Sequence, residues 1–301
     1  MELKELEHFI AVVDYEGFSK AASNIYVSQP TLSKSIKKLE ETLNVILFER
    51  STRKLELTDA GQLVYNKAIK IINATEELKI SLDDLLHVPS GDIKIGIPPL
   101  IGTLFFPVIA KKFDQIHPQI SLHLSEHGAK RIEYLIEDGK VDVGIVVLPV
   151  NERKFTVTPF INEEFRLFVH SNHPLANRKK VHLRDLRDES FILFNKEFSL
   201  HDLIISQCET IGGFTPNIAY ESSQWDLIAE LVGSELGITL LPKTIYSKMN
   251  RSEIAAVQIE SPPMWNLAII TKKDRYLSYA VRSLLQFLHE KYQPDKDTDR
   301  A

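Results

Sequence analysis

A polar, basic helix follows a tight turn near the start of this 301-residue chain, and this feature constrains the fold more than any other. Ser28 has the side chain of a helix N-cap, and Pro30 stands at an early helical position where its missing N–H is harmless. Leu32, Ile36 and Leu39 then repeat at spacings of four and three, so they must face a core. The polar side chains between them therefore face outward.

An apolar helix is predicted before this segment, and a glycine at position 17 ends it. Its buried stripe is expected to consist of Leu3, Leu6, Phe9, Ile10 and Val13. Ser19 is predicted to be the N-cap of a short helix over residues 20–24. Two short helices that meet at a tight turn form a helix-turn-helix, a motif that places its second helix in the major groove of DNA.

The outward face of the second helix carries two kinds of side chain. Gln29 and Ser33 have the size and type that hydrogen-bond base edges, whereas lysines suit phosphates. Residues 47–57 resemble two short strands and a turn, which would form a basic wing beside the helix. The candidate DNA-binding residues are Ser28, Gln29, Pro30, Thr31, Ser33, Lys34, Lys37, Lys38, Arg50 and Arg53.

Local charge supports DNA as the partner. Basic residues exceed acidic ones by four over residues 20–54, although the net charge of the chain is −5. The alternative is that the lysines form only the solvated face of an amphipathic helix, which is the usual meaning of such a run. The wing and the two predicted caps favour DNA.

The same stretch resembles LysR-type transcriptional regulators. The matching residues are Ala21-Ala22, Ser28-Gln29-Pro30, Leu32-Ser33, Leu39-Glu40, Leu47-Phe48, Arg50 and the run from Leu57 to Gly61. The chain departs from the family at Lys34 and Ser35, where members often have arginine and glutamine. Lys34 would contact a phosphate with its charge but without the two parallel hydrogen bonds that an arginine can donate. The resemblance implies a winged helix-turn-helix domain over residues 1–57, tetramers built as pairs of dimers, inverted-repeat promoter DNA and RNA polymerase as partners.

A long helix is predicted over residues 58–90, up to a break at Pro89-Ser90-Gly91. Leu57, Val64, Ile71, Leu78 and Leu85 recur every seven residues, with Gly61, Ala68, Thr75 and Leu82 as a companion series. This heptad pattern predicts a dimerisation helix. The predicted dimerisation residues are Leu57, Val64, Ala68, Ile71, Leu78, Leu82 and Leu85. The alternative is a single helix that lies on its own domain.

After residue 91 the pattern changes to alternating strands and helices, which predicts an α/β domain with a parallel sheet covered on both faces. The resemblance implies a two-lobed, periplasmic-binding-protein-like effector domain over residues 91–301. Lobe I would comprise about 91–160 and 265–293, and lobe II about 161–264, with a hinge near Pro159 and near Pro262-Pro263. The predicted fold class is therefore α/β with an N-terminal all-α winged helix-turn-helix and a long linker helix.

Clefts of this construction bind small molecules at the ends of strands. The turn at residues 98–103 leads from a strand into a helix, and its backbone N–H groups favour an anion, with a carboxylate as the expected ligand. The candidate effector residues are Pro98, Pro99, Leu100, Ile101, Gly102, Thr103, Glu126, Gly128, Val147, Leu148, Phe198, His201, Ser222 and Ser223. The alternative for the first of these is a proline pair that only rigidifies the turn.

The effector half also resembles the CidR-like branch of LysR regulators, through residues 96–102 and 126–130. That branch is associated with holin-like genes and with pyruvate and acetate metabolism, so pyruvate or acetate is the expected effector. The rival functions are a solute-binding protein, an architectural DNA protein, and an α/β enzyme with an accessory DNA-binding domain. No nucleophile elbow, phosphate loop or metal-ligand spacing supports an enzyme, a metal or a cofactor.

Cys208 is the single cysteine, and it is expected to be a small buried residue of a helix. The N-terminal residues lack a signal-peptide pattern and no run of eighteen apolar residues occurs, so a cytoplasmic protein without a membrane partner is expected. The polar residues 293–301 are expected to fray.

Overall fold

The computed structural model describes residues 1–49, 55–85, 90–249 and 252–292. The chain divides into two compact units, Met1–Val88 and Pro89–Ala301. The predicted terminal fraying at 293–301 and the turn of the predicted wing lie outside the described residues.

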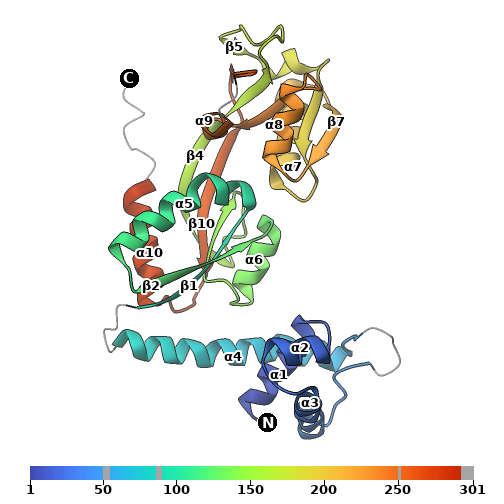
Figure 1. Ribbon diagram of the computed structural model, residues 1–301, viewed down its shortest axis with the longest axis vertical. Coiled ribbons are helices and arrows are strands. Elements are labelled where there is room, and N and C mark those ends of the chain that lie inside the picture. Colours follow the sequence, from blue (N-terminus) through green and yellow to red (C-terminus); the bar gives the residue numbers. More distant parts are fainter. Residues whose placement is uncertain (50–54, 86–89, 250–251, 293–301) are drawn as a thin grey trace. The chain divides into compact units, whose positions relative to one another are not determined.

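The described residues of the first unit form the helices α1 (Leu3–Asp14), α2 (Phe18–Asn24), α3 (Gln29–Leu43) and α4 (Asp59–Leu85) (Figure 1). Phe9 lies at the centre of its core, where its ring meets the rings of Phe48 and Tyr65 at centroid distances of 5.4 and 6.5 Å. Tyr65 belongs to α4, so the first turns of the long helix are part of this core. The predicted domain boundary after residue 57 therefore falls inside one packed unit.

The predicted stripe of α1 is wrong at its two ends. Leu3 is exposed and Val13 is only half-buried, whereas Val12 is fully buried. The helix packs against both α3 and α4, so its buried face is wider than one stripe and includes two polar residues. One of these is His8, whose Nδ1 lies 2.9 Å from the hydroxyl of Ser35 on α3.

The predicted start of α2 is also wrong. The helix begins at Phe18 with Gly17 at the N-cap position, so Ser19 lies inside the first turn and is not the cap. The ring of Phe18 packs on Phe48 at a centroid distance of 5.6 Å. This contact accompanies a helix start two residues earlier than the serine alone suggested.

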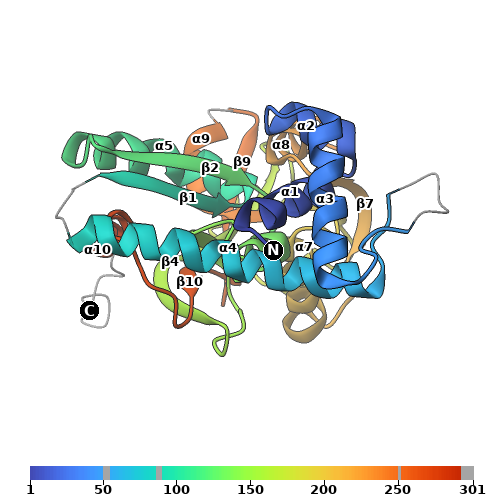
Figure 2. The same ribbon diagram turned by 90° about the horizontal axis from the view of Figure 1, so that it is seen from below.

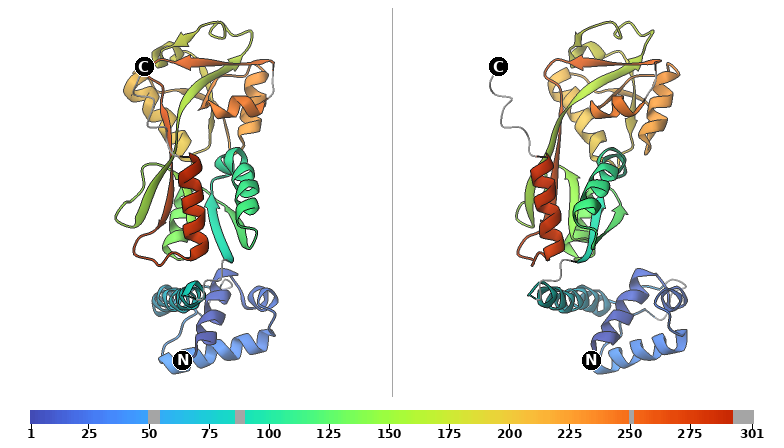
Figure 3. Two further views of the ribbon diagram at one scale, coloured as in Figure 1. Left: turned by 90° about the vertical axis from the view of Figure 1, so that its left-hand side faces the viewer. Right: turned by 60° about the vertical axis from the view of Figure 1, so that its left-hand side comes forward.

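The second unit is built from two lobes (Figure 3). Lobe I contains β1 (Gly91–Ile97), α5 (Pro99–Ile116), β2 (Ile120–Glu126), α6 (Ala129–Glu137), β3 (Val143–Val147) and α10 (Tyr279–Tyr292). Strand β1 pairs in parallel with β2 and with β3. Helices α5 and α10 cover one face of these strands and α6 covers the other, as predicted for a sheet with helices on both faces.

Lobe II contains β5 (Lys180–Val181), β6 (Ser190–Phe194), α7 (Ser199–Gln207), β7 (Asn217–Ser222), α8 (Trp225–Gly233), β8 (Thr239–Pro242), α9 (Thr244–Met249) and β9 (Ile254–Ile259). A 3₁₀ turn at Leu183–Leu186 and a π-helical turn at Cys208–Gly212 complete it. Strands β6 and β7 pair in parallel, and Phe191 forms a bridge to Ile238 beside β8. The sequence patterns did not predict β5, β9 or the two short turns.

Two long strands cross from one lobe to the other. These are β4 (Phe155–His170) and β10 (Met264–Lys272), which pair antiparallel to each other and run side by side in Figure 1. The eight-stranded sheet has the order β2-β1-β3-β10-β4-β9-β5, with β8 also paired to β4. The sheet is therefore mixed: β1 pairs in parallel with β2 and β3, and β5 with β9, whereas β10 and β4 pair antiparallel with their neighbours. The predicted parallel pairing is also found in the separate sheet of β6 and β7.

The ladder between the crossing strands is irregular where a hinge was predicted. Leu267 pairs with Ile161 and Ala268 pairs with Pro159, so Phe160 is the extra residue of a β-bulge. A proline fits such a position because it cannot donate to a regular ladder. The bulge turns Phe160 into the core, where its ring meets Tyr292 of α10 at a centroid distance of 5.0 Å.

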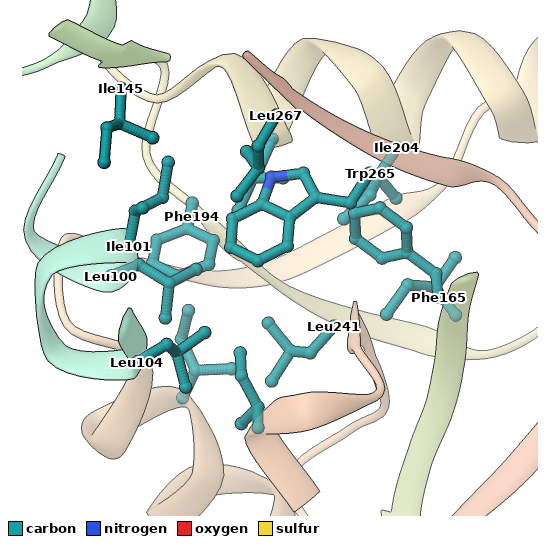
Figure 4. Packing of buried hydrophobic residues seen from close by; sticks show 14 of the residues in the cluster. Leu100, Ile101, Leu104, Ile145, Phe165, Phe194, Ile204, Leu241, Trp265 and Leu267 are labelled. Carbon is teal, nitrogen blue, oxygen red and sulfur yellow. The ribbon is translucent and has the colours of Figure 1, made fainter. Parts of the chain in front are cut away.

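One continuous apolar core fills the space between the lobes. Trp265 of β10 lies at its centre with no exposed surface, between α5 of lobe I and β6, β8 and α7 of lobe II (Figure 4). The residues labelled around it in Figure 4 are Leu100, Ile101, Leu104, Ile145, Phe165, Phe194, Ile204, Leu241 and Leu267. The lobes are held by packed side chains as well as by the two strands.

Candidate nucleic-acid interface and ligand site

The start of α3 is built as its sequence predicts. The Ser28 hydroxyl accepts a hydrogen bond from the Thr31 N–H at 3.3 Å, and the helix ends at Asn44 in the left-handed conformation. Leu32, Ile36 and Leu39 are buried, with at most 3% of their surface exposed. The opposite face is exposed and carries Ser28, Gln29, Pro30, Thr31, Ser33, Lys34, Lys37 and Lys38.

Ser19 has a role that the sequence patterns missed. Its hydroxyl donates a hydrogen bond of 3.1 Å to Gln29 Oε1, from α2 to the first residue of α3. With this carbonyl occupied, the amide NH₂ of Gln29 is the group left to meet a base edge as a donor. The contact fixes the side chain that is the first candidate for base recognition.

Lys38 differs from the other lysines of α3. Its Nζ lies 2.8 Å from Glu2 Oε1 and 2.7 Å from Glu5 Oε1 of α1. The hydrogen bond from Lys38 lowers the pKa of Glu5, and the bonds to Glu2 and Glu5 raise the pKa of Lys38. A DNA phosphate would have to replace the Glu2 and Glu5 carboxylates at the Lys38 ammonium. The predicted contact of Lys38 with DNA is therefore disfavoured.

Lys37 and Lys38 should therefore respond differently to substitution. Lys37→Gln is expected to reduce the slope of log affinity for DNA against log salt concentration by about one. Lys38→Gln is expected to change that slope much less and to lower the melting temperature, because Glu5 is buried and loses its partner. Fluorescence anisotropy at several salt concentrations measures the slopes. Equal slopes for the two variants would contradict the assignment.

The base of the predicted wing is present in the described residues. Phe48 and Leu57 form an antiparallel bridge, and the Glu49 N–H donates to the Glu56 carbonyl at 2.9 Å. Arg50 and Arg53, the two predicted contacts of the wing, lie outside the described residues.

Helix α4 has two different halves. Its first half packs into the first unit, where Ala68 is buried and Leu57 and Val64 are half-buried. Gly61 is also buried, and a Cβ built on it would lie 2.1 Å from the Leu47 carbonyl oxygen. Gly61 and Ala68 therefore serve close packing on their own unit, which leaves Ala68 almost no exposed surface for the dimer contact predicted for it.

The second half of α4 is apolar and largely exposed. Ile71, Leu78, Leu82 and Leu85 have 38%, 62%, 52% and 73% of their surface exposed. In Figure 2 the helix extends well beyond the part that α1 and α3 cover. This half carries the predicted dimerisation residues that the chain itself does not bury.

The predicted anion site at residues 98–103 is not an open loop. Helix α5 begins at Pro99, four residues before its predicted start, and the Gly102 N–H already donates to the Pro98 carbonyl at 2.9 Å. The Thr103 hydroxyl donates to the Pro99 carbonyl at 3.0 Å. Leu100 and Ile101, predicted as ligand walls, are buried in the core between the lobes because α5 packs there.

A carboxylate of the protein itself lies beside the start of α5. Glu126 is the last residue of β2, and its Oε1 would lie 3.2 Å from a Cβ built on Gly102. Negative charge near a helix N-terminus is favourable. The Glu126 carboxylate therefore supplies the negative charge that an anionic ligand was predicted to supply at the start of α5. Two residues further on, Gly128 approaches lobe II, since a Cβ on it would lie 3.6 Å from the Glu197 carbonyl oxygen.

His201 is buried, with 4% of its surface exposed. Its Nδ1 lies 3.0 Å from Asp202 Oδ1, and its Nε2 lies 3.1 Å from Glu221 Oε1 at the end of β7. Phe198, just before α7, is half-buried and its ring packs on Phe194 at 5.2 Å. These contacts fix the loop that faces Gly128.

The remaining candidates are dispersed around the same strand ends. Ser222 is buried and its hydroxyl accepts a hydrogen bond from the Gln224 N–H at 3.0 Å, whereas Ser223 is exposed. Val147, the last residue of β3, and Leu148, which follows it, are half-buried. The structure thus brings Gly128 of lobe I to the loop before α7, places Glu126 beside Gly102, and buries Leu100, Ile101 and Ser222.

A cavity of about 670 Å³ lies elsewhere in the second unit. It is lined by Phe105, Ile161, Asn162, Glu163, Arg166, Lys243, Thr244, Tyr246, Ser247 and Ala256. None of the predicted effector residues is among these. Sequence patterns missed the cavity because its residues come from two helices and two strands that only the fold brings together.

No group of three or more metal-ligating side chains lies together in the described parts of the chain. The described helices include none that is long and apolar enough to cross a membrane.

Two family models cover almost the whole chain. The model "Bacterial regulatory helix-turn-helix protein, lysR family" matches residues 3–62, and the model "LysR substrate binding domain" matches residues 87–293. This chain belongs to the LysR family. It is a LysR-type DNA-binding transcriptional regulator with a ligand-binding domain, as the sequence resemblance predicted. Proteins of this family are transcriptional regulators, which are not enzymes.

Relatives of the LysR family match along their full length. The uncharacterized HTH-type transcriptional regulator YwbI of Bacillus subtilis is 42% identical over 99% of both chains. A hydrogen peroxide-inducible genes activator of Pectobacterium carotovorum is 27% identical over 99% of both. The solved structure of full-length CbnR complexed with its target DNA has a TM-score of 0.70 at 20% identity, and covers 96% of this chain and 99% of its own. The likeness to CbnR confirms the two-domain LysR fold.

Proposed function

We propose that this LysR regulator binds inverted-repeat promoter DNA in the cytoplasm as a homodimer or a pair of dimers. The observation that carries the proposal is the exposed polar face of α3, on which Ser19 of α2 holds Gln29 in place. Gln29 and Ser33 are the proposed base contacts, and Lys34 and Lys37 the proposed phosphate contacts. RNA polymerase is the proposed partner at the promoter.

Dimerisation is proposed through the second half of α4. Four of its exposed apolar residues, Ile71, Leu78, Leu82 and Leu85, stand at positions of the heptad pattern, and a second copy would remove them from water. Two α3 helices joined in this way would address half-sites about 34 Å apart, or a multiple of that distance. Leu78→Lys with Leu85→Lys is expected to produce monomers that bind DNA weakly, which light scattering coupled to size exclusion measures.

A small organic acid is the proposed effector, with pyruvate and acetate as the first compounds to test. It would bind between Glu126, which lies beside the start of α5, and Gly128, which meets the loop before α7. Because the Glu126 carboxylate lies beside the start of α5, an acid would bind more tightly when that charge is removed. Binding there would bias the arrangement of the lobes and, by linkage, the affinity for DNA.

Substitution at Glu126 tests the effector class. Glu126→Gln is expected to lower the concentration of pyruvate or acetate that changes DNA affinity by about tenfold. Asp114→Asn removes the same charge from the exposed far end of α5 and should leave that concentration unchanged. Anisotropy titrations with and without each acid measure the effect. If neither acid alters DNA binding by wild type or by Glu126→Gln, the effector class is wrong and the DNA-binding assignment stands.

A solute-binding protein and an enzyme with an accessory DNA-binding domain are the alternative functions. The first would bind pyruvate or acetate without any change in its affinity for DNA. The second would consume its ligand. No specific contact in the described residues favours either alternative.

A peroxide response through Cys208 is not expected, although one relative is a hydrogen peroxide-inducible activator. The thiol is buried, and burial raises the pKa of Cys208 to about 12, with Glu209 as a smaller cause. Thiolates are the reactive form, so almost none is present near neutral pH. We expect slow reaction of the native protein with a thiol reagent at pH 8, rapid reaction in urea, and unchanged DNA binding after mild peroxide treatment.

A further inference from the structure

The turn between α2 and α3 carries an aromatic side chain that is almost fully solvated. Tyr26 has 95% of its surface exposed, more than any other large apolar or aromatic side chain of the described residues. Neither its ring nor its hydroxyl contacts or hydrogen-bonds another side chain in the described parts of the chain. The Tyr26 side chain therefore gains nothing from the packing of the first unit.

The backbone at Tyr26 is unfavourable for a tyrosine. Its φ is +56°, in the left-handed region, and it directly follows Ile25, the C-cap of α2. The Val27 N–H donates to the Ala22 carbonyl at 3.0 Å, which is the closing bond of a Schellman motif. Glycine, or less often asparagine, is preferred at this position, because a larger side chain is strained there.

The other left-handed positions show what this backbone usually accepts. Apart from Tyr26, the described residues other than glycine that have a positive φ are all polar or charged, and they are Glu16, Asn44, Glu235, Ser261 and Asp274. A bulky residue in this conformation is an outlier that costs stability. The stability of the fold therefore does not explain a tyrosine at position 26.

The position of Tyr26 next to α3 indicates what it could contact. Tyr26 precedes Ser28, the N-cap of α3, by two residues. Its neighbours Ile25 and Val27 pack against the core of the first unit, so the backbone between them is held in place while the tyrosine side chain lies in solvent. In a helix-turn-helix, the recognition helix meets base edges, whereas the helix before it crosses the DNA backbone.

We propose that the Tyr26 hydroxyl donates a hydrogen bond to a phosphate of the promoter DNA. Tyrosine hydroxyls are among the neutral donors that contact phosphate oxygens. The contact adds affinity for every sequence and selects no base. The inference rests on the proposed DNA-binding face of α3, and it adds to that face a residue that carries no charge.

Tyr26→Phe tests the contact, because it removes the hydroxyl and keeps the ring. Anisotropy of the full-length protein with labelled upstream DNA and with shuffled DNA, at several salt concentrations, measures the affinity, the sequence preference and the salt slope. We expect about fivefold weaker binding to both DNAs. The salt slope should equal that of wild type, because a phenol hydroxyl has no charge at neutral pH and its contact releases no counterion. Lys37→Gln should instead lower the slope by about one.

Two further variants separate the contact from folding. Glycine suits left-handed backbone, so Tyr26→Gly should keep the melting temperature of wild type or raise it by a few degrees. Its binding to both DNAs should nevertheless be weaker by about fivefold or more. Tyr15→Phe makes the same change in another exposed tyrosine of the first unit, at the end of α1, and should bind DNA like wild type.

Three results would overturn the proposal. The first is that Tyr26→Phe binds both DNAs as tightly as wild type. The second is that it changes the preference between the two DNAs, since the hydroxyl would then contact a base. The third is that Tyr26→Gly lowers the melting temperature together with the affinity, since the tyrosine would then be structural. If Gln29→Ala and Lys37→Gln have no effect either, the proposed face of α3 is wrong as well; if those two variants behave as expected, only the role of Tyr26 is wrong.

Discussion

Gly61→Ala is expected to destabilise the DNA-binding unit by about 3 kcal/mol, although alanine normally stabilises a helix interior by about 1 kcal/mol over glycine. The reason is steric. A Cβ at this position would lie 2.1 Å from the carbonyl oxygen of Leu47 and 3.0 Å from Leu57 Cδ2. The first contact is with backbone, which cannot move aside as the end of a side chain can. Helix α4 would have to separate from the segment that leads into the wing.

Gly102→Ala provides the matched control, because this glycine also lies inside a helix and is buried. The nearest atom to its added Cβ would be Glu126 Oε1 at 3.2 Å, the end of a flexible side chain. Urea unfolding of the two variants measures the difference, and we expect Gly61→Ala to lose most of its DNA binding as well. A Gly61→Ala protein as stable as wild type would show that α4 does not pack on Leu47.

Trp265→Ala is expected to reduce the free energy of unfolding of the second unit by about 3–5 kcal/mol. The side chain is fully buried between the lobes, so its removal leaves a cavity lined by α5 of lobe I and by β6 and β8 of lobe II (Figure 4). Because the cavity adjoins both lobes, their relative positions should also become less well defined. Faster amide hydrogen exchange in α5 and β6 would report this loosening.

Trp265→Phe separates packing from hydrogen bonding. The indole Nε1 of Trp265 is buried without a hydrogen-bond partner among the described residues, which is unfavourable. Phenylalanine keeps most of the apolar volume and removes this N–H, so we expect a much smaller loss of stability than for alanine. If Trp265→Ala costs less than about 1 kcal/mol, the lobes are not held together by this core.

The sequence predicted the elements that have strong local signals. Ser28, Pro30 and the apolar spacing of α3 define a helix whose exposed face follows from geometry alone. The alternation of strands and helices after residue 91 predicted the parallel pairing of β1 with β2 and β3. In each case the pattern is set by residues close together in the chain.

The errors arise where distant segments decide the outcome. Gly61 and Ala68 fit a heptad pattern, but the contact they allow is with Leu47 and α1 of the same unit. Ser19 has the side chain of an N-cap, but Phe18 packs on Phe48 and starts the helix earlier. Arg166 and Lys243 lie 77 positions apart, so no local pattern could place them in one cavity.

The ligand site was the least predictable feature for the same reason. Strand ends and a proline-rich turn indicated an anion site at residues 98–103, yet α5 begins at Pro99 and Glu126 lies beside it. The pattern identified the correct edge of the sheet. It could not show that Leu100 and Ile101 belong to the core that joins the lobes.

The central claim is that α3 reads DNA through Gln29 and binds its backbone through Lys37. Its most direct test is the anisotropy of labelled DNA from the region upstream of the gene, against shuffled DNA of equal composition, at two salt concentrations. We predict salt-sensitive binding by wild type that prefers the upstream DNA. Gln29→Ala should reduce this preference. Lys37→Gln should weaken binding to both DNAs and leave the preference between them unchanged. Equal binding of both DNAs by wild type, or equal effects of the two substitutions on both DNAs, would contradict the account.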